Sequence, residues 1–113
     1  YLDYTDRMVQ WFERVSKETL EYEVSQILLL HANQLNADVM EEMLARLKKR
    51  GYSFVTLDET LKDMAYMKVD RYVGKSGPSW LYRWAAGPNT PNLMRNEPDP
   101  PAWVTQMFQE QSK

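Results

Sequence analysis

Apolar residues recur on one helical face through the first part of the chain. They are Tyr4, Met8, Trp11, Phe12 and Val15. Spacings of three and four residues are typical of an amphipathic α-helix. We therefore predict a helix that ends near residue 20 and has Asp3 or Thr5 as its N-cap.

Two short runs further along the chain carry the pattern of β-strands. The run "ILLL" at residues 27–30 is too short for a buried helix and too uniformly apolar for a strand with one solvent-exposed face. The run "YSFVTL" at residues 52–57 alternates and is rich in aromatic and β-branched residues. We predict two parallel strands, the first of them covered on both faces.

The residues between these runs carry the start and stop signals of a second helix. Asn36 is the predicted N-cap, the positive residues 48–50 lie near the C-terminal end, and Gly51 can adopt the left-handed conformation that ends a helix. The predicted apolar stripe consists of Val39, Met40, Met43, Leu44 and Leu47. Asp58 can cap a further short helix over residues 59–66.

The composition changes after residue 66 to aromatic residues, Gly and Pro. We predict a short helix over residues 78–86, an extended proline-rich connector over residues 87–101 and a last helix from residue 102 to about residue 109. Trp103, Met107 and Phe108 would anchor that last helix to the body. Residues 1–66 thus form the main body, and residues 67–113 form an extension that packs on it.

The alternation of helices and strands favours an α/β fold with parallel strands. A complete (β/α)8 barrel needs about 200 residues or more, whereas this chain has 113. Two strands cannot shield their own edges, so the fold looks incomplete. The chain also begins without Met and enters a helical pattern almost at once, which is what a piece of a longer protein would do.

Composition excludes some classes of function. The 14 Lys and Arg are scattered among 16 Asp and Glu and the net charge is −2, which argues against nucleic acid as a partner. There is no cysteine, so disulfides and thiolate metal sites are excluded. No apolar run approaches the roughly 18 residues of a membrane span.

His31 is the only histidine of the chain and directly follows the first predicted strand. Side chains alternate along a strand, so Leu29 and His31 would face the same side, which in a barrel would be the inside at the active-site end. A histidine with an ordinary pKa near 6.5 can exchange a proton at neutral pH. Taken from the residues alone, His31 is more simply a hydrogen-bonded residue at a strand end, because no catalytic partner is visible.

The stretch "ILLLHANQLNADVMEEMLARLKKRGYSFVTLDETLKD" resembles the C-terminal part of the polysaccharide deacetylase family, carbohydrate esterases of family 4 with a NodB homology domain. Residues 29–31 match that family's last motif, Leu-x-His, and residues 50–59 match its last helix and strand. Residues 65–84 resemble an extension found in some bacterial members. The resemblance covers about residues 1–86 and implies that the chain is the C-terminal fragment of a distorted (β/α) barrel.

The resemblance also implies a chemistry. In this family a metal ion, usually zinc, polarises the acetyl carbonyl and a bound water, and an aspartate acts as general base. Carried over, His31 is the general acid that protonates the departing amine, and Leu29 lines the pocket for the acetyl methyl group. The substrate would be an acetylated carbohydrate, and the location extracellular or periplasmic.

The metal-binding motifs of the family have no counterpart in this chain, because one histidine cannot build that site. We therefore expect zinc to be bound by the missing N-terminal half of the barrel and the isolated chain to be inactive. The alternative is a non-catalytic interaction module, derived from the barrel, that forms a homodimer through its strand edges. Asp58, Glu59, Glu41 and Glu42 are better explained as helix-terminal or solvated residues than as catalytic ones.

The aromatic residues Trp80, Tyr82 and Trp84 have two interpretations. They can form a stacking surface for sugar rings. Alternatively, Trp80 and Trp84 lie four positions apart on one helical face and pack the C-terminal extension onto the body. The helical spacing favours packing.

Overall fold

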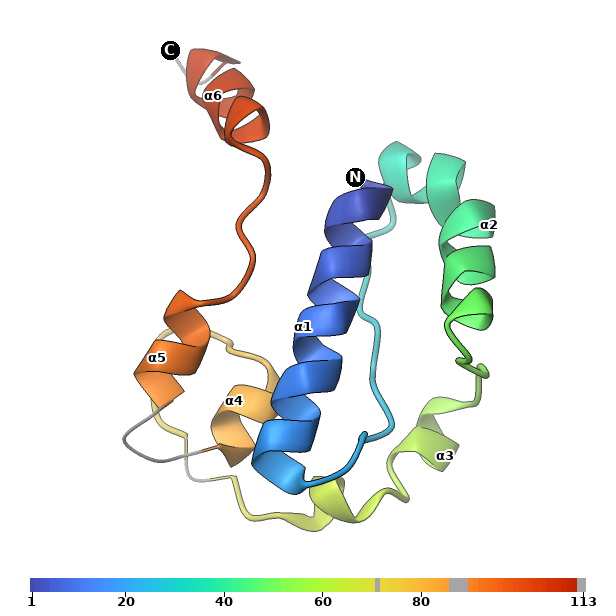
Figure 1. Ribbon diagram of the computed structural model, residues 1–113, viewed down its shortest axis with the longest axis vertical. Coiled ribbons are helices and arrows are strands. Elements are labelled where there is room, and N and C mark those ends of the chain that lie inside the picture. The colour runs from blue at the N-terminus through green and yellow to red at the C-terminus, as the bar shows by residue number, and fades with distance from the viewer. Residues whose placement is uncertain (71, 86–89, 112–113) are drawn as a thin grey trace.

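A long first helix, α1, is the element against which the rest of the protein is arranged. The computed structural model describes residues 1–70, 72–85 and 90–111. Its elements are α1 (Leu2–Leu20), α2 (Gln34–Lys49), α3 (Leu57–Thr60), the 3₁₀ helix η1 (Met64–Met67), α4 (Trp80–Trp84), α5 (Thr90–Arg95) and α6 (Ala102–Gln111). α2 lies on one side of α1, and α4 and α5 lie on the other (Figure 1).

The described residues contain helices and extended segments but no β-strand. The predicted α/β fold, a barrel fragment with two parallel strands, is therefore wrong, and the described part of the chain is all-α. Residues 27–30 and 52–56 lie between helices in stretches without regular secondary structure, and the stretch between α1 and α2 runs along α1 (Figure 1). Extended backbone becomes a strand only when it exchanges hydrogen bonds with a neighbour, and these two stretches make no such bonds with each other.

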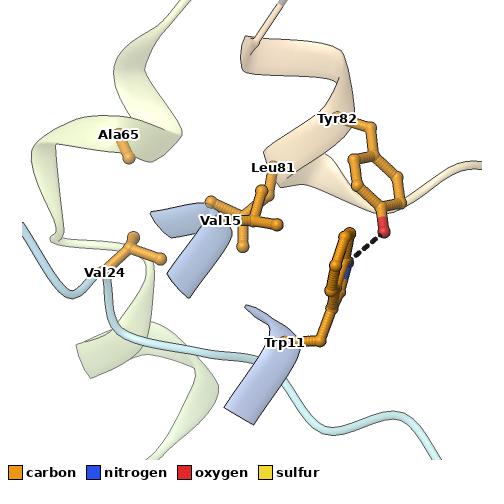
Figure 2. Close-up of a cluster of buried hydrophobic side chains, with 6 residues drawn as sticks. All are labelled: Trp11, Val15, Val24, Ala65, Leu81 and Tyr82. Atoms are coloured by element: carbon orange, nitrogen blue, oxygen red, sulfur yellow. Dashed lines mark hydrogen bonds between the residues drawn. The ribbon is translucent and has the colours of Figure 1, made fainter. Parts of the chain in front are cut away.

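The apolar core lies on one face of α1, as the helical spacing predicted. The buried residues of this cluster are Trp11, Val15, Val24, Ala65, Leu81 and Tyr82 (Figure 2). The indole Nε1 of Trp11 donates a hydrogen bond of 2.6 Å to the Tyr82 hydroxyl, which in turn donates to Glu97 Oε2 at 2.6 Å. The core thus joins α1 to α4 and to the chain that follows α5.

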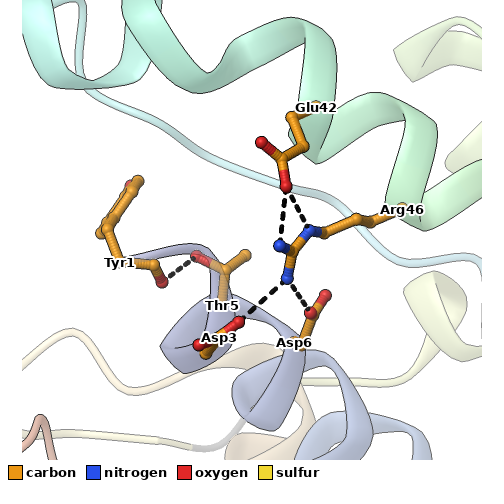
Figure 3. Close-up of polar contacts among 6 residues, drawn as sticks. All are labelled: Tyr1, Asp3, Thr5, Asp6, Glu42 and Arg46. Carbon is orange, nitrogen blue, oxygen red and sulfur yellow. Dashed lines mark hydrogen bonds and ion pairs between the residues drawn. The ribbon is translucent and has the colours of Figure 1, made fainter.

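Arg46 connects α2 to the start of α1 (Figure 3). Its guanidinium lies 2.7 Å from Asp6 Oδ2, 3.1 Å from Asp3 Oδ1 and 2.7 Å from Glu42 Oε1. Hydrogen bonds to Glu42, Asp6 and Asp3 raise the pKa of Arg46 above its ordinary value. Three acidic side chains from two helices therefore share one cation.

The predicted body of α2 is confirmed, but its first residue is not. Met43 and Leu47 of the predicted stripe are buried, and Gly51 has the positive φ of 98° expected after a helix end. The helix begins earlier than predicted, because the side chain of Asn33, not that of Asn36, caps it and accepts from the Asn36 backbone N–H at 2.9 Å.

Two further caps differ from the prediction. Tyr1 precedes α1 and makes no side-chain cap, so neither Asp3 nor Thr5 is the N-cap. Thr56 caps α3 through a 3.3 Å hydrogen bond from the Glu59 backbone N–H, and Asp58 lies inside that helix. α1 is otherwise in place, whereas the single helix predicted over residues 59–66 is replaced by α3, which ends at Thr60, and the separate η1.

The C-terminal part departs more from the sequence pattern. The helix predicted over residues 78–86 is represented by α4, and residue 86 lies outside the described residues. α5 falls within residues 87–101, which were predicted to be extended, and residues 87–89 lie outside the described part of the chain. Pro at a first-turn position is compatible with such a short helix.

α6 forms as predicted but does not pack as predicted. Trp103, Met107 and Phe108 remain 62%, 50% and 72% exposed, so they do not anchor the helix to the body. In Figure 1 α6 stands at the end of an extended arm, away from the other helices. The radius of gyration is 15.7 Å, whereas about 13 Å is expected for a compact domain of this length.

We predict that Tyr82→Phe lowers the free energy of unfolding by about 1–3 kcal/mol, because the buried Trp11 N–H loses the Tyr82 hydroxyl as its acceptor. Urea unfolding followed by circular dichroism measures the change. Tyr72→Phe is the matched control, since its hydroxyl bonds to Ser76 at an exposed position. Equal effects of the two substitutions would contradict this account of the core.

Candidate functional site

The candidate site is the extended stretch that carries Leu29 and His31, here called the His31 segment (residues 23–32). It follows α1 and leads into α2. In Figure 1 it returns from the C-terminal end of α1 to the level of the α1 N-terminus. Hydrogen bonds from α1, η1 and α2 hold its two ends.

Ser16 and Val24 place the first end of the His31 segment against α1. The Ser16 side chain is fully buried. Its hydroxyl donates to the Tyr22 carbonyl at 2.8 Å and accepts from the Val24 backbone N–H at 2.9 Å. These two bonds turn the chain immediately after the helix and bring Val24 into the core.

Asp63 holds the same end from the other side. Its carboxylate accepts hydrogen bonds from the Tyr22 hydroxyl, from the Ser25 backbone N–H at 2.9 Å and from the Ala65 backbone N–H at 3.0 Å. The Tyr66 hydroxyl donates to the Ser25 carbonyl at 2.7 Å. Burial alone would raise the pKa of Asp63, but the hydrogen bonds that it accepts outweigh burial and hold the pKa below its usual value.

Asn36 holds the other end of the segment, at His31. Its side-chain Nδ2 donates to the His31 carbonyl at 2.7 Å, and its Oδ1 accepts from the Tyr1 hydroxyl at 2.5 Å. Asn36 is only 5% exposed. The His31 backbone is thereby tied to the beginnings of both α1 and α2.

The middle of the His31 segment is exposed at residues 27–29. Within the described part of the chain, the backbone groups of residues 26–30 make no hydrogen bond. Ile27 and Leu28 are about half exposed, Leu29 is 88% exposed, and the His31 side chain is exposed as well. Leu29 and His31 are therefore both exposed and lie two residues apart in the same segment.

A second extended stretch, residues 52–56, also presents apolar side chains to the outside. Its start is fixed by Tyr52, whose hydroxyl donates to Glu13 Oε1 at 2.9 Å, while Arg50 binds the other oxygen of the same carboxylate at 2.5 Å. Phe54 and Val55 further along are 49% and 54% exposed. Large apolar surfaces left open in this way are typical of interaction sites.

The described residues provide no site for zinc. No group of three or more His, Cys, Asp or Glu lies close enough to hold a metal ion. Asp58, Glu59, Glu41 and Glu42 are all exposed. Glu42 forms an ion pair with Arg46. His31 is thus the one candidate acid–base group, and no second catalytic side chain is brought beside it within the described chain.

The three aromatic residues of α4 differ in how far they are buried. Tyr82 is buried, Trp84 is partly buried against the core, and Trp80 is 43% exposed. The rings of Trp80 and Trp84 stack with their centroids 5.9 Å apart, and the Arg83 guanidinium lies 4.5 Å from the Trp80 ring. Tyr82 is therefore not available to a sugar, and Trp84 packs as the helical spacing suggested.

Sequence reasoning identified Asn36 as a helix cap and missed its contact with His31. The signal that distinguishes the two roles is the second asparagine three residues earlier, Asn33. Because Asn33 caps α2, the Asn36 side chain is free to turn toward the His31 carbonyl. Two asparagines at this spacing can divide the capping and bracing roles between them.

Comparison with known proteins gave no match to a family model, to a curated protein or to a solved structure. Among the described residues, no helix is both long enough and apolar enough to cross a membrane.

We predict that acidification weakens the fold through Asp63. The pKa of Asp63 is lower in the folded chain than in the unfolded chain, so as the pH falls the unfolded chain protonates this carboxylate first. The free energy of unfolding therefore decreases as the pH falls below about 4. Thermal unfolding between about pH 6 and pH 3 should show a steeper loss for the parent chain than for Asp63→Asn. Asp58→Asn, at an exposed position, should follow the parent curve; an Asp63→Asn curve with the parent's slope would refute the assignment.

Proposed function

We propose that this chain supplies the acid-bearing element of a polysaccharide deacetylase-like hydrolase, which removes N-acetyl or O-acetyl groups from a carbohydrate. His31 is the general acid and Leu29 contacts the acetyl methyl group. The observation that carries the proposal is the His31 segment itself, because it is braced at both ends and leaves these two side chains uncovered. The Leu-x-His resemblance supplies the reaction.

The chemistry explains why an acid is needed. When water adds to an acetamide carbonyl, the carbon–nitrogen bond can break only if the electron pair leaves with nitrogen. An unprotonated amide nitrogen is a very poor leaving group, so a proton must reach it as the bond breaks. A positioned acid typically contributes 10² to 10⁴ in rate, and the exposed His31 imidazole is the group of this site that can supply that proton.

Leu29 fits the accompanying role of an apolar wall. An 88% exposed leucine keeps nearly its whole side chain in water, and covering it is favourable by roughly 25 cal/mol per Å² of buried apolar surface. An acetyl methyl group beside Leu29 would bury part of this surface. Leu29 lies two residues before His31, so the methyl group and the nitrogen of one acetamide can be recognised by the same segment.

The described residues do not fit a metal site, so the metal expected for this class of enzyme must be held by another polypeptide part. The same part must provide the group that activates water. The open apolar surfaces at residues 26–30 and 52–56 are suited to docking it. The missing N-terminal half of the enzyme is the partner that this proposal requires.

We predict that the chain alone, with zinc and an acetylated amino-sugar oligomer, releases no acetate. Mixed with an N-terminal deacetylase part that carries the metal-binding motifs and lacks Leu-x-His, it should restore acetate release. His31→Gln should then lower the rate at least about 100-fold, because the leaving nitrogen loses its acid. Ala32→Gln, a neighbouring exposed position, is the control. Turnover by the chain alone, or an unchanged rate in His31→Gln, would contradict the proposal.

A second candidate function, a dimerising interaction module without catalysis, is favoured by the same exposed apolar side chains. In that case the chain should be a dimer at micromolar concentration in sedimentation equilibrium. Leu29→Asp should weaken the dimer at least about tenfold, since a carboxylate would be buried at the interface. Val73→Asp, at a 97% exposed position outside these segments, is the control. A monomer that restores deacetylation in the mixture would exclude this alternative.

A further inference from the structure

We propose that Asn36 is the positioning residue of the site. Its side chain fixes the His31 backbone and so determines the position of the His31 imidazole. The consequence for catalysis rests on the proposed function of His31. The brace itself is a property of the folded chain and can be measured without any activity.

The hydrogen bonds of Asn36 use both ends of its side-chain amide. The Nδ2 group donates to the His31 carbonyl at 2.7 Å, and Oδ1 accepts from the Tyr1 hydroxyl at 2.5 Å. The Asn36 backbone N–H is already taken by Asn33. A side chain that is 5% exposed and bonded in this way has little freedom to move.

The chemistry of the site explains why this residue is an asparagine. An amide donates through nitrogen and accepts through oxygen, so it can join a carbonyl to a hydroxyl donor. An ionised aspartate of nearly the same shape has only acceptors and would face the His31 carbonyl with a negative charge. Alanine would remove both bonds and leave the Tyr1 hydroxyl without this acceptor.

The brace matters because, among the residues that the structure describes, no other hydrogen bond holds the His31 backbone. The neighbouring backbone groups of residues 26–30 make no hydrogen bond within the described chain, and the imidazole is exposed. A general acid must lie within hydrogen-bond reach of the atom that it protonates, and a displacement of about 1 Å can cost 10²-fold in rate. Asn36 is the contact that sets the position of the His31 carbonyl.

The test uses Asn36→Asp, with Ala37→Asp as the matched control. Both substitutions place a new carboxylate in the first turn of α2, where the helix dipole favours negative charge, so α2 should remain helical in both. Only Asn36→Asp removes the donor to His31. Ala37 is exposed, so its substitution adds the charge without touching the brace.

The first readout is nuclear magnetic resonance of the full 113-residue chain. In the parent and in Ala37→Asp, the backbone of residues 30–32 should be as ordered as that of α2, and the Asn36 side-chain amide protons of the parent should exchange slowly. In Asn36→Asp, the order of residues 30–32 should fall while α2 remains helical, and the buried carboxylate should lower the thermal midpoint. Unchanged order at these residues would overturn the positioning role.

The second readout is deacetylation in the mixture described above. Asn36→Asp should lower kcat by about 10- to 100-fold with little change in KM, and Ala37→Asp should not. Full activity of Asn36→Asp beside a strongly impaired His31→Gln would overturn the inference while the proposed function stands. Loss of order in Asn36→Asp with an unaffected His31→Gln would uphold the brace and overturn the proposed function.

Discussion

The burial of one face of α1 is the constraint on which the rest of the structure depends. Trp11 and Val15 lie on that face, and the chain returns to it at Val24, Ala65 and Leu81. Each return fixes the path of a segment that has little regular structure of its own. Because this core is small, few other apolar contacts direct the fold. Hydrogen bonds from buried polar side chains therefore position many of the segments between the helices.

Three polar residues determine the path of the His31 segment; Ser16 and Asn36 are buried, and Asp63 is partly exposed. Ser16 and Asp63 hold its first end, and Asn36 holds its last. Buried polar groups of this kind are stable only when they are bonded, so the bonds specify a particular backbone path. The segment is consequently extended without belonging to a sheet, and its middle remains available to a ligand or to another polypeptide.

The longer helices, α1, α2 and α6, were the predictable part of this fold. The stripe at Met43 and Leu47 and the terminator Gly51 led to α2 in nearly the right place, because helix formation and helix ends depend on neighbours in sequence. The strands were not predictable in the same way. Residues 27–30 and 52–57 have the composition of strands, but a strand requires a partner, and sequence pattern does not show whether one is in reach. The anchoring of α6 was not predictable for a similar reason, since the apolar character of Trp103 does not show whether a surface lies in reach, and this side chain is 62% exposed.

The sequence by itself determined the positions of α1, α2 and α6 and the core positions Trp11, Val15, Met43 and Leu47, because these follow from local spacing. The candidacy of His31 with Leu29 came from the family resemblance. Only the tertiary structure decided that Asn33 caps α2, that Asn36 braces His31, and that Leu29 stays exposed. These outcomes depend on bonds between residues such as Tyr1 and Asn36 that lie far apart in the chain. The sequence pattern does not show which buried donor bonds to which distant acceptor. These pairings are therefore determined only when the chain folds.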